Sequence, residues 1–233
     1  MISPWMLAEV PHLVHSLSKH IGSDKEVTPR GDDHPVILYP GFTASNTSMS
    51  LMRRLLKANG HNVVCWNHHR NNGMNEKLIA KLVVQVRLMA EESEQRVSLV
   101  GHSLGGTIAR TVANIATESV AGVVTIGSPI NNLDGVLDRV KDKYDAINHT
   151  HTSDEAWEEY KDTVTRALQV PCTSIWSAKD GIVPNAASIV AEPLGENIEV
   201  GGGHFSMIVD PVVIYHIAVA ISSHSSLITT SNS

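Results

Sequence analysis

The residues best suited to chemistry lie in a glycine-rich turn, Gly101-His102-Ser103-Leu104-Gly105. An apolar run typical of a strand precedes the turn, and residues 104–117 after it have the composition of a helix. A serine on such a sharp strand-to-helix turn is strained and projects its hydroxyl outward, and glycines two positions away on either side leave the space that the turn needs. The following helix also points its N-terminus at the reacting oxygen. We therefore predict that Ser103 is a catalytic nucleophile, the alternative being a chance glycine-rich turn.

A serine nucleophile needs a base and an acid that orients the base, and after this kind of turn the chain order is serine, acid, histidine. His204 follows three consecutive glycines just beyond a predicted strand, as expected of a loop that must curl back toward Ser103. The other histidines after Ser103 fall in an insertion, in a helix or in the C-terminal tail: His149, His151, His216 and His224. We therefore predict that His204 is the base.

The acid should lie on the loop after the fifth predicted strand, where Asp180 is the only carboxylate. Asp180 also fits a simple Asp-Gly turn, because Gly181 follows it. Asp210 is the second candidate, and we interpret it as the cap of a helix that begins at Pro211. We predict that Asp180 is the orienting acid.

Two backbone N–H groups should stabilise the oxyanion that forms when the serine attacks. One is expected from Leu104, directly after the nucleophile, and the other from Phe42, which follows Gly41 in the loop after the first predicted strand. The ring of Phe42 could also line the acyl pocket or simply pack. Phe42 and His102 are our predicted substrate-binding residues.

The elements that must position these residues alternate between strand and helix from His34 onward. Apolar runs predict strands at 35–39, 62–66, 96–100, 122–126, 171–176 and 197–200. Helical spacing predicts helices at 5–20, 48–59, 75–92, 104–117 and 211–222. Continuously apolar strands separated by helices indicate a parallel sheet buried on both faces, with functional loops at the carboxyl ends of the strands.

A single domain over residues 1–233 accounts for this pattern. Residues 1–33 are expected to form an N-terminal helix and loop, and 223–233, rich in Ser and Thr, a flexible tail. Residues 129–169 interrupt the alternation with two acidic, helix-like segments, 133–148 and 153–168. We interpret this insertion as a helical cap over the site, the alternative being a solvated helical pair on the sheet.

Composition excludes several classes of protein. With 42% hydrophobic and 18% charged residues the chain is not typical of a disordered protein, and a net charge of −6 without a Lys/Arg cluster argues against nucleic-acid binding. Cys65 and Cys172 cannot form a multi-bridge scaffold and are expected to be buried free thiols. The longest apolar run, 211–221, is too short to span a bilayer, and the N-terminal residues lack a basic segment. We therefore expect a cytoplasmic protein without stable membrane insertion.

Taken together, the motifs give the chain a resemblance to α/β-hydrolase-fold serine hydrolases of the small bacterial lipase and esterase type. The matching segments are HPVILYPGF, SLVGHSLGGTIAR, TIGSP, SAKDGIVP and GGGHF, in the family's order. The resemblance implies a triad of Ser103, Asp180 and His204 with the oxyanion donors Phe42 and Leu104. Because the family's first two antiparallel strands have no counterpart before His34, we expect a minimal, mostly parallel sheet of about six strands.

More narrowly, the chain is similar to compact bacterial hydrolases that share RGDDHPVILYPGFTAS, DGIVP and a Trp-x-x-x-Arg-Asn run, here Trp66 to Asn71. We interpret Arg70 and Asn71 as residues that pin the oxyanion loop through hydrogen bonds to its backbone, the alternative being substrate contact. His68 and His69 lack further ligands at a suitable spacing, so no metal site is expected.

The expected activity is hydrolysis of carboxylic esters through an acyl-enzyme, which requires no cofactor or metal. Short-to-medium acyl esters are the first choice of substrate. The alternatives are a lipase on longer acylglycerols, an acyltransferase or thioesterase with the same triad, and a non-catalytic binding protein. Four methionines, Met6, Met49, Met52 and Met74, indicate either an adaptable apolar pocket or ordinary core filling.

Overall fold

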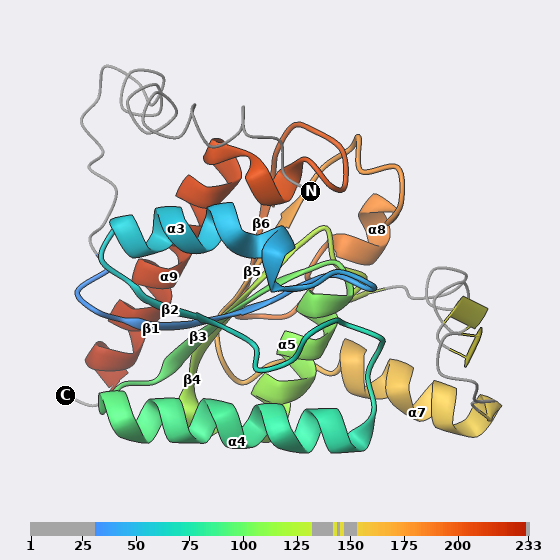
Figure 1. Cartoon of the computed structure of the whole chain (residues 1–233), viewed down its shortest axis with the longest axis horizontal. Helices are drawn as coiled ribbons and strands as arrows, with labels where there is room; N and C mark the ends of the chain where they lie inside the picture. The colour runs from blue at the N-terminus through green and yellow to red at the C-terminus, as the bar shows by residue number, and fades with distance from the viewer. Residues whose placement is uncertain (1–30, 132–141, 144, 147–152, 232–233) are drawn as a thin grey trace.

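A six-stranded sheet organises the chain in the computed structural model, which describes residues 31–131, 142–143, 145–146 and 153–231 (Figure 1). The strand order is β2-β1-β3-β4-β5-β6, and every neighbouring pair is parallel. The expected sheet of about six strands is therefore confirmed, and within the described residues it is parallel throughout.

All six predicted strands are present, with ends displaced by one or two residues. They are β1 (Pro35–Tyr39), β2 (Asn62–Cys65), β3 (Val97–His102), β4 (Val120–Ile126), β5 (Cys172–Trp176) and β6 (Gly195–Glu199). The most informative difference is at β3, which runs to His102 and so ends directly at Ser103.

The predicted helices after residue 34 are also present, in part preceded by short 3₁₀ segments. The helical elements are η1 (Asn46–Met49), α3 (Ser50–Ala58), α4 (Glu76–Ser93), α5 (Leu104–Ile115), η2 (Thr117–Ser119), α7 (Asp154–Thr165), α8 (Asn185–Ser188), η3 (Met207–Val209) and α9 (Pro211–Ser231). The predicted helix at 5–20 lies outside the described residues. The short α8 was not predicted from the sequence.

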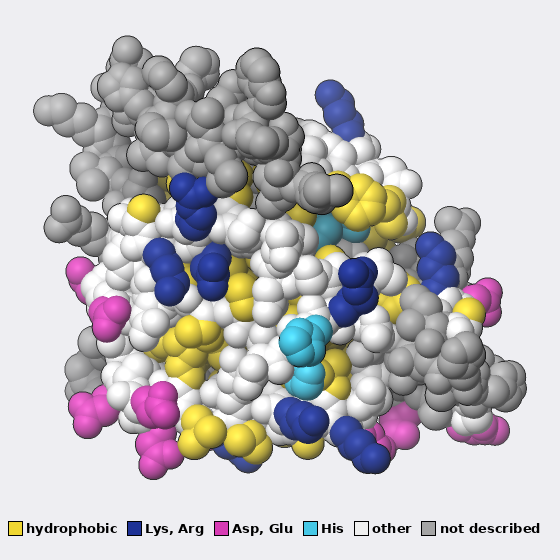
Figure 2. All heavy atoms as spheres, viewed as in Figure 1, with side chains coloured by type: hydrophobic (Ala, Val, Ile, Leu, Met, Phe, Trp, Pro, Cys, Tyr) yellow, Lys and Arg dark blue, Asp and Glu magenta, His cyan; other side chains and the backbone are white. Residues whose placement is uncertain are grey.

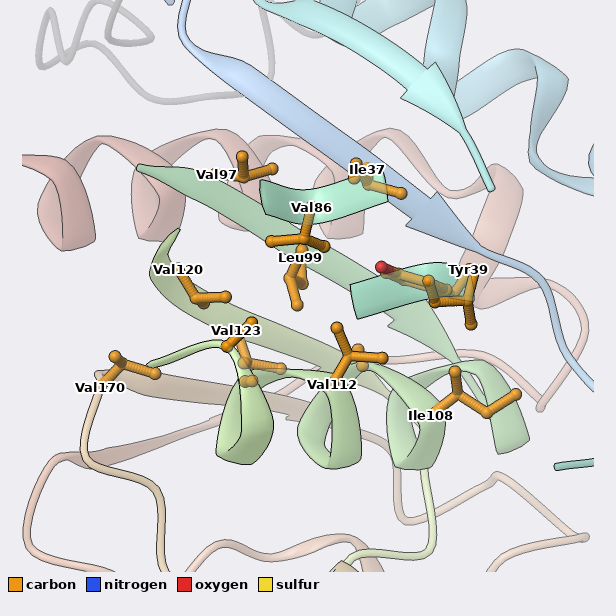
Figure 3. Close-up of a cluster of buried hydrophobic side chains, with 14 of the residues drawn as sticks. Ile37, Tyr39, Val86, Val97, Leu99, Ile108, Val112, Val120, Val123 and Val170 are labelled. Atoms are coloured by element: carbon orange, nitrogen blue, oxygen red, sulfur yellow. The ribbon is translucent and has the colours of Figure 1, made fainter. Parts of the chain in front are cut away.

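Helices cover both faces of the sheet, as the apolar strands require. Side chains alternate along β1, so Ile37 and Tyr39 join the cluster under α4 and α5, whereas Val36 and Leu38 join the cluster under α3 and α9. Figure 3 shows the first cluster, in which strand residues meet Val86 of α4. The sheet is thus a rigid, doubly covered platform for the loops at its carboxyl end.

The insertion is described only in part, and its second half is helix α7. This helix packs against α5 through the buried Val164. Its C-terminal end is held by Arg110 of α5, whose Nε donates to the Val164 carbonyl at 3.2 Å while its other nitrogens pair with Glu192 at 2.8 and 2.9 Å. Most of the first predicted segment, 133–148, lies outside the described residues.

The expectation of a flexible tail from residue 223 is wrong for residues 223–231, which continue α9. Some polar side chains in this stretch find hydrogen-bond partners, although His224 Nδ1 has none. The buried His224 shares a hydrogen bond with Thr173 Oγ1 at 3.0 Å, and Ser225 Oγ donates to the Ile221 carbonyl at 2.9 Å. A Ser- and Thr-rich composition therefore does not prevent ordering where hydroxyls find partners on the helix itself.

Both cysteines are free, but only Cys172 is fully buried, so the expectation of two buried thiols is correct for Cys172 and only partly so for Cys65. None of the helices in the described part of the chain has the length and apolar character that a membrane span requires.

Candidate active site

Ser103 occupies the turn between β3 and α5 with φ 53° and ψ −127°, in the left-handed region that side chains rarely adopt. A Cβ at Gly101 would overlap the carbonyl group of Gly105, and one at Gly105 would overlap the carbonyl oxygen of Tyr39. The two glycines are therefore required by close backbone approach, as predicted. The turn is fixed by a hydrogen bond from the Ser103 amide to the Ile126 carbonyl at 2.8 Å.

The loops after β5 and β6 bring Asp180 and His204 together. His204 Nδ1 lies 2.8 Å from Asp180 Oδ2, and both side chains are buried. The backbones are joined as well, because the His204 amide donates to the Asp180 carbonyl at 3.1 Å. Asp180 Oδ1 accepts from the amides of Ile182 and Val183 at 2.9 and 2.7 Å, which fixes the carboxylate plane.

These contacts keep Asp180 ionised. Burial raises the pKa of the carboxyl group, but the hydrogen bond with His204 and the amides of Val183 and Ile182 outweigh it and hold the pKa below its usual range. An ionised carboxylate only accepts, so the shared proton belongs to Nδ1 of His204. The other ring nitrogen, Nε2, is then the basic one.

Ser103 and His204 line the same pocket, which has a volume of about 670 Å³. Much of its lining is apolar, with Phe42, Leu104, Pro129, Val183, Phe205 and Ile208 among the contributors. Of the described residues of the insertion, Pro129 and Lys143 line the pocket and none from α7 does. The covering role predicted for the insertion remains a prediction.

The two predicted oxyanion donors, Phe42 and Leu104, both line this pocket. Leu104 is the first residue of α5, so its amide belongs to the unpaired N-terminal turn of that helix. Within the described part of the chain, neither amide donates a hydrogen bond to a protein acceptor. Both remain available for an oxyanion.

Arg70 and Asn71 pin the oxyanion loop, as predicted. Asn71 Nδ2 donates to the Pro40 carbonyl at 2.8 Å, and the Asn71 backbone exchanges hydrogen bonds with Thr43 and Ala44 at 2.7 and 2.9 Å. Arg70 donates to the Thr43 carbonyl. The loop that carries Phe42 is thus tied to the segment after β2 on several sides.

His102 lines the pocket but is almost entirely buried. It is only 3% exposed, and its Nε2 donates to the backbone carbonyl of His204 at 2.9 Å. Burial, and then the nearby His204 ring, lower the pKa of His102 to about 4, so the ring is neutral near pH 7. The predicted substrate-binding role remains a prediction, and the contact indicates a second role in positioning His204.

Three residues that support the pair were not assigned from the sequence. Gly127 has φ 51°, and a Cβ there would lie 2.7 Å from Asp180 Oδ2 and 3.3 Å from His204 Nδ1. Ser128 fills the space beside Gly106, and Ser177 Oγ donates to the Gly202 carbonyl at 2.6 Å. For Gly127 and Ser128, the available signal was the Gly-Ser-Pro sequence that follows β4.

Most of the other residues singled out in the sequence cap a helix, fill the core or lie within a helix. Asp210 Oδ1 accepts from the Val212 amide at 2.8 Å, which confirms it as the cap of α9. Met49 and Met52 are fully buried and Met74 packs against the core, which favours core filling, whereas Met6, His149 and His151 lie outside the described residues. His216 lies in α9, as predicted. No group of three or more His, Cys, Asp or Glu among the described residues could hold a metal ion.

Comparison with known proteins places the chain in a family. The PGAP1-like alpha/beta domain matches residues 69–192, more than half of the chain. Triacylglycerol lipases of Pseudarthrobacter phenanthrenivorans and Burkholderia plantarii are each 47% identical over 58 residues, which are 25% of this chain. That match spans only 17% and 15% of the lipases' own lengths.

Solved structures with the same fold include a monoacylglycerol lipase from Paleococcus ferrophilus and lipase B from Aspergillus fumigatus. The first has a TM-score of 0.58 and 17% identity, covering 82% of this chain and 96% of its own. The second has a TM-score of 0.61 and 17% identity, covering 84% of this chain and 53% of its own. The resemblance to lipase- and esterase-like α/β hydrolases is thus confirmed, and the chain belongs to the PGAP1-like alpha/beta domain family.

Proposed function

We propose that this chain is a serine hydrolase that cleaves carboxylic esters through an acyl-enzyme formed on Ser103. The observation that carries the proposal is the shared pocket, which is lined by a serine on a strained strand-to-helix turn and by a histidine bonded to a buried carboxylate at 2.8 Å. These are the nucleophile, base and orienting acid that acyl transfer requires.

In the first half-reaction, Nε2 of His204 takes the proton of Ser103 as its oxygen attacks the ester carbonyl. The amides of Phe42 and Leu104 donate to the oxyanion, and the imidazolium returns the proton to the leaving alcohol. In the second half-reaction, His204 removes a proton from water, which attacks the acyl-enzyme, and the imidazolium then returns that proton to the oxygen of Ser103 as the acid leaves. Asp180 holds the Nδ1–H tautomer and stabilises the imidazolium in both steps.

Short-to-medium acyl esters are the proposed substrates. A volume of about 670 Å³ lies within the usual range of small-molecule sites, and the apolar lining suits an alkyl chain rather than a charged group. A lipase acting on longer acylglycerols is the second candidate, favoured by the identity shared with the two triacylglycerol lipases. The Ser103, His204 and Asp180 roles are the same in both cases.

The experiment is hydrolysis of a series of p-nitrophenyl esters with acyl chains from two to sixteen carbons, on wild type and Ser103→Ala in parallel. We expect serine-dependent turnover that peaks at short or medium chains. A peak at the longest chains would select the lipase alternative. Equal turnover by wild type and Ser103→Ala, with both proteins folded by circular dichroism, would overturn the proposal.

A further inference from the structure

Acidic residues are unevenly distributed along this acidic chain. The sequence contains 24 Asp and Glu, yet residues 34–75 contain none. An even distribution would place about four acids in a stretch of that length. The same stretch contains Arg53, Arg54, Lys57 and Arg70, all exposed. The segment from β1 to the start of α4 is therefore a basic sector in a chain of net charge −6, which corrects the expectation that the chain has no Lys/Arg cluster.

One end of this sector, the loop 41–44 with Ser48, lines the pocket. The pocket loop 41–44 leads through η1 into α3, which carries three of the four cations. The segment η3, just beyond Phe205, packs against α3 from the other side. Figure 2 shows Lys and Arg side chains over α3 and on the face beside it, with Asp and Glu toward the margins.

Two further cations, Lys143 and Lys179, stand at the pocket. Lys143 lines it, and Lys179, which precedes Asp180 in the chain, is exposed. No Asp or Glu in the described part of the chain forms an ion pair with any of these six cations. We call the exposed set Arg53, Arg54, Lys57, Arg70, Lys143 and Lys179 the basic face.

Large apolar side chains are exposed at the same mouth. Phe205 is 69% exposed and Ile182 is 50% exposed, and both line the pocket. Each lies within two residues of a member of the catalytic pair, Phe205 beside His204 and Ile182 beyond Asp180. These two residues form what we call the apolar rim. Exposed aromatic and aliphatic groups around a functional opening are typical of an interaction surface.

The acids are found on other elements. Glu91, Glu92 and Glu94 are exposed at the end of α4, and Glu155, Glu158 and Glu159 are exposed on α7. Such a separation of charge orients a protein in an external field. An anionic surface would attract the basic face and repel the C-terminal end of α4, which leads into the start of β3 at the edge of the sheet opposite the pocket, and so would turn the pocket mouth toward itself.

We propose that the basic face and the apolar rim dock the pocket mouth onto an anionic lipid surface. Cations attract the headgroup layer, and Phe205 and Ile182 are positioned to enter the boundary between headgroups and acyl chains. A nucleic acid would use the cations but would leave the apolar rim without a partner. The inference goes beyond ester hydrolysis and does not require turnover, because docking is a property of the surface.

The test measures binding of the full-length Ser103→Ala protein to vesicles, so that failure of the hydrolase proposal does not affect it. Vesicles of phosphatidylcholine alone are compared with vesicles that also contain phosphatidylglycerol, at low and high salt. We expect binding to the anionic vesicles only, weakening as salt rises. Replacing three surface cations by Arg53→Ser, Arg54→Ser and Lys57→Ser should weaken it on the order of 100-fold at low salt, about fivefold for each cation.

A matched control removes three exposed arginines elsewhere, by Arg87→Ser, Arg96→Ser and Arg166→Ser. This control has the same net charge as the α3 variant and should bind nearly as wild type. With Ser103 restored, the α3 variant should hydrolyse a soluble short ester at the wild-type rate. Phe205→Ser should weaken the binding that survives high salt.

Four results would overturn the proposal. The first is that the Ser103→Ala protein binds no vesicle, and the second is that it binds both vesicle types equally. The third is that the α3 variant and its matched control lose the same amount of binding to anionic vesicles. The fourth is that the protein binds a DNA duplex more tightly than anionic vesicles. The last result would assign the basic face to a nucleic acid.

Discussion

Buried histidines lie at both ends of the sheet. Among the described residues, only the carboxyl end, which holds the proposed catalytic site, pairs one of them with a carboxylate. At the carboxyl ends of the strands, His204 pairs with the buried Asp180 at 2.8 Å. At the opposite end, His34, His61 and His224 are equally buried, at or near the starts of the strands. None of the described acids forms an ion pair with these three.

The hydrogen-bond partners of the histidines at the second end are neutral side chains, and His61 has none. His34 Nε2 and Ser98 Oγ lie 2.9 Å apart, whereas neither ring nitrogen of His61 has a hydrogen-bond partner in the structure. Burial, with a contribution from His34, lowers the pKa of both His61 and His224 to about 4. Burial thus leaves His61 and His224 neutral near pH 7, and the carboxylate at hydrogen-bond distance is the feature that distinguishes His204, the proposed base.

Replacing a buried histidine by leucine should greatly lower the esterase activity at the carboxyl end of the sheet and leave it almost unchanged at the opposite end. His204→Leu should lower kcat/KM for the best ester at least 10⁴-fold, because the base is lost. His61→Leu should leave kcat/KM within about twofold of wild type, because the side chain it removes has no hydrogen bonds to lose. Steady-state kinetics on both variants measures the contrast.

Circular dichroism and thermal unfolding control for folding in both variants. Comparable losses of activity in the two variants would contradict the distinction between the two ends.

Acid should destabilise the protein through its buried neutral histidines. These are His102 at the carboxyl end and His61 and His224 at the opposite end. The unfolded chain takes up protons on His61 and His224 near pH 6.5, but the folded chain does so only near pH 4. Above pH 6.5 both histidines are neutral in the folded and the unfolded chain, so they do not reduce the free energy of unfolding. As pH falls from 6.5 toward 4, the free energy of unfolding decreases by roughly 3 kcal/mol for each histidine. Among the groups facing His61, His34 lowers its pKa further and Asp32 opposes the shift.

Urea unfolding at pH 7.5 and pH 5 measures this loss. His61→Leu should show a smaller difference between the two pH values than wild type. A wild-type stability that is the same at both pH values would contradict the prediction.

A smaller loss of activity than that of His204→Leu is expected at His102, which contacts the backbone of His204 and has no proposed role in proton transfer. His102→Leu removes the hydrogen bond to the His204 carbonyl and should lower kcat by roughly 10- to 100-fold, with KM nearly unchanged. His102→Gln, which can still donate from its amide, should recover part of the loss. A rise in KM with kcat unchanged would instead support the substrate-binding role predicted from the sequence.

The catalytic end was predictable because its constraints are local. Gly101 and Gly105 flank Ser103 in a short motif, and continuously apolar runs place the strands whose carboxyl ends carry Asp180 and His204. A parallel sheet brings these loops to one edge whatever the details of the helices. The pinning of the Phe42 loop by Arg70 and Asn71 was also predictable, because both residues follow the neighbouring strand.

The features of the fold and the site that were not predicted depend on contacts between residues far apart in the chain. No local signal shows that His102 bonds the backbone 102 positions later, or that Ser177 holds Gly202. The C-terminal extension of α9 was missed for the same reason, because His224 is ordered by burial against Gly122 and Thr173 on two strands. Periodicity and composition cannot predict such contacts.

The most direct measurement of the central claim is covalent labelling with a fluorophosphonate, followed by peptide mass spectrometry. We predict one label per chain, located on Ser103, with labelling slowed strongly by His204→Leu and unaffected by His61→Leu. Absence of any label in a folded wild-type protein, or a label on another serine that persists in Ser103→Ala, would contradict the assignment of Ser103 as the nucleophile.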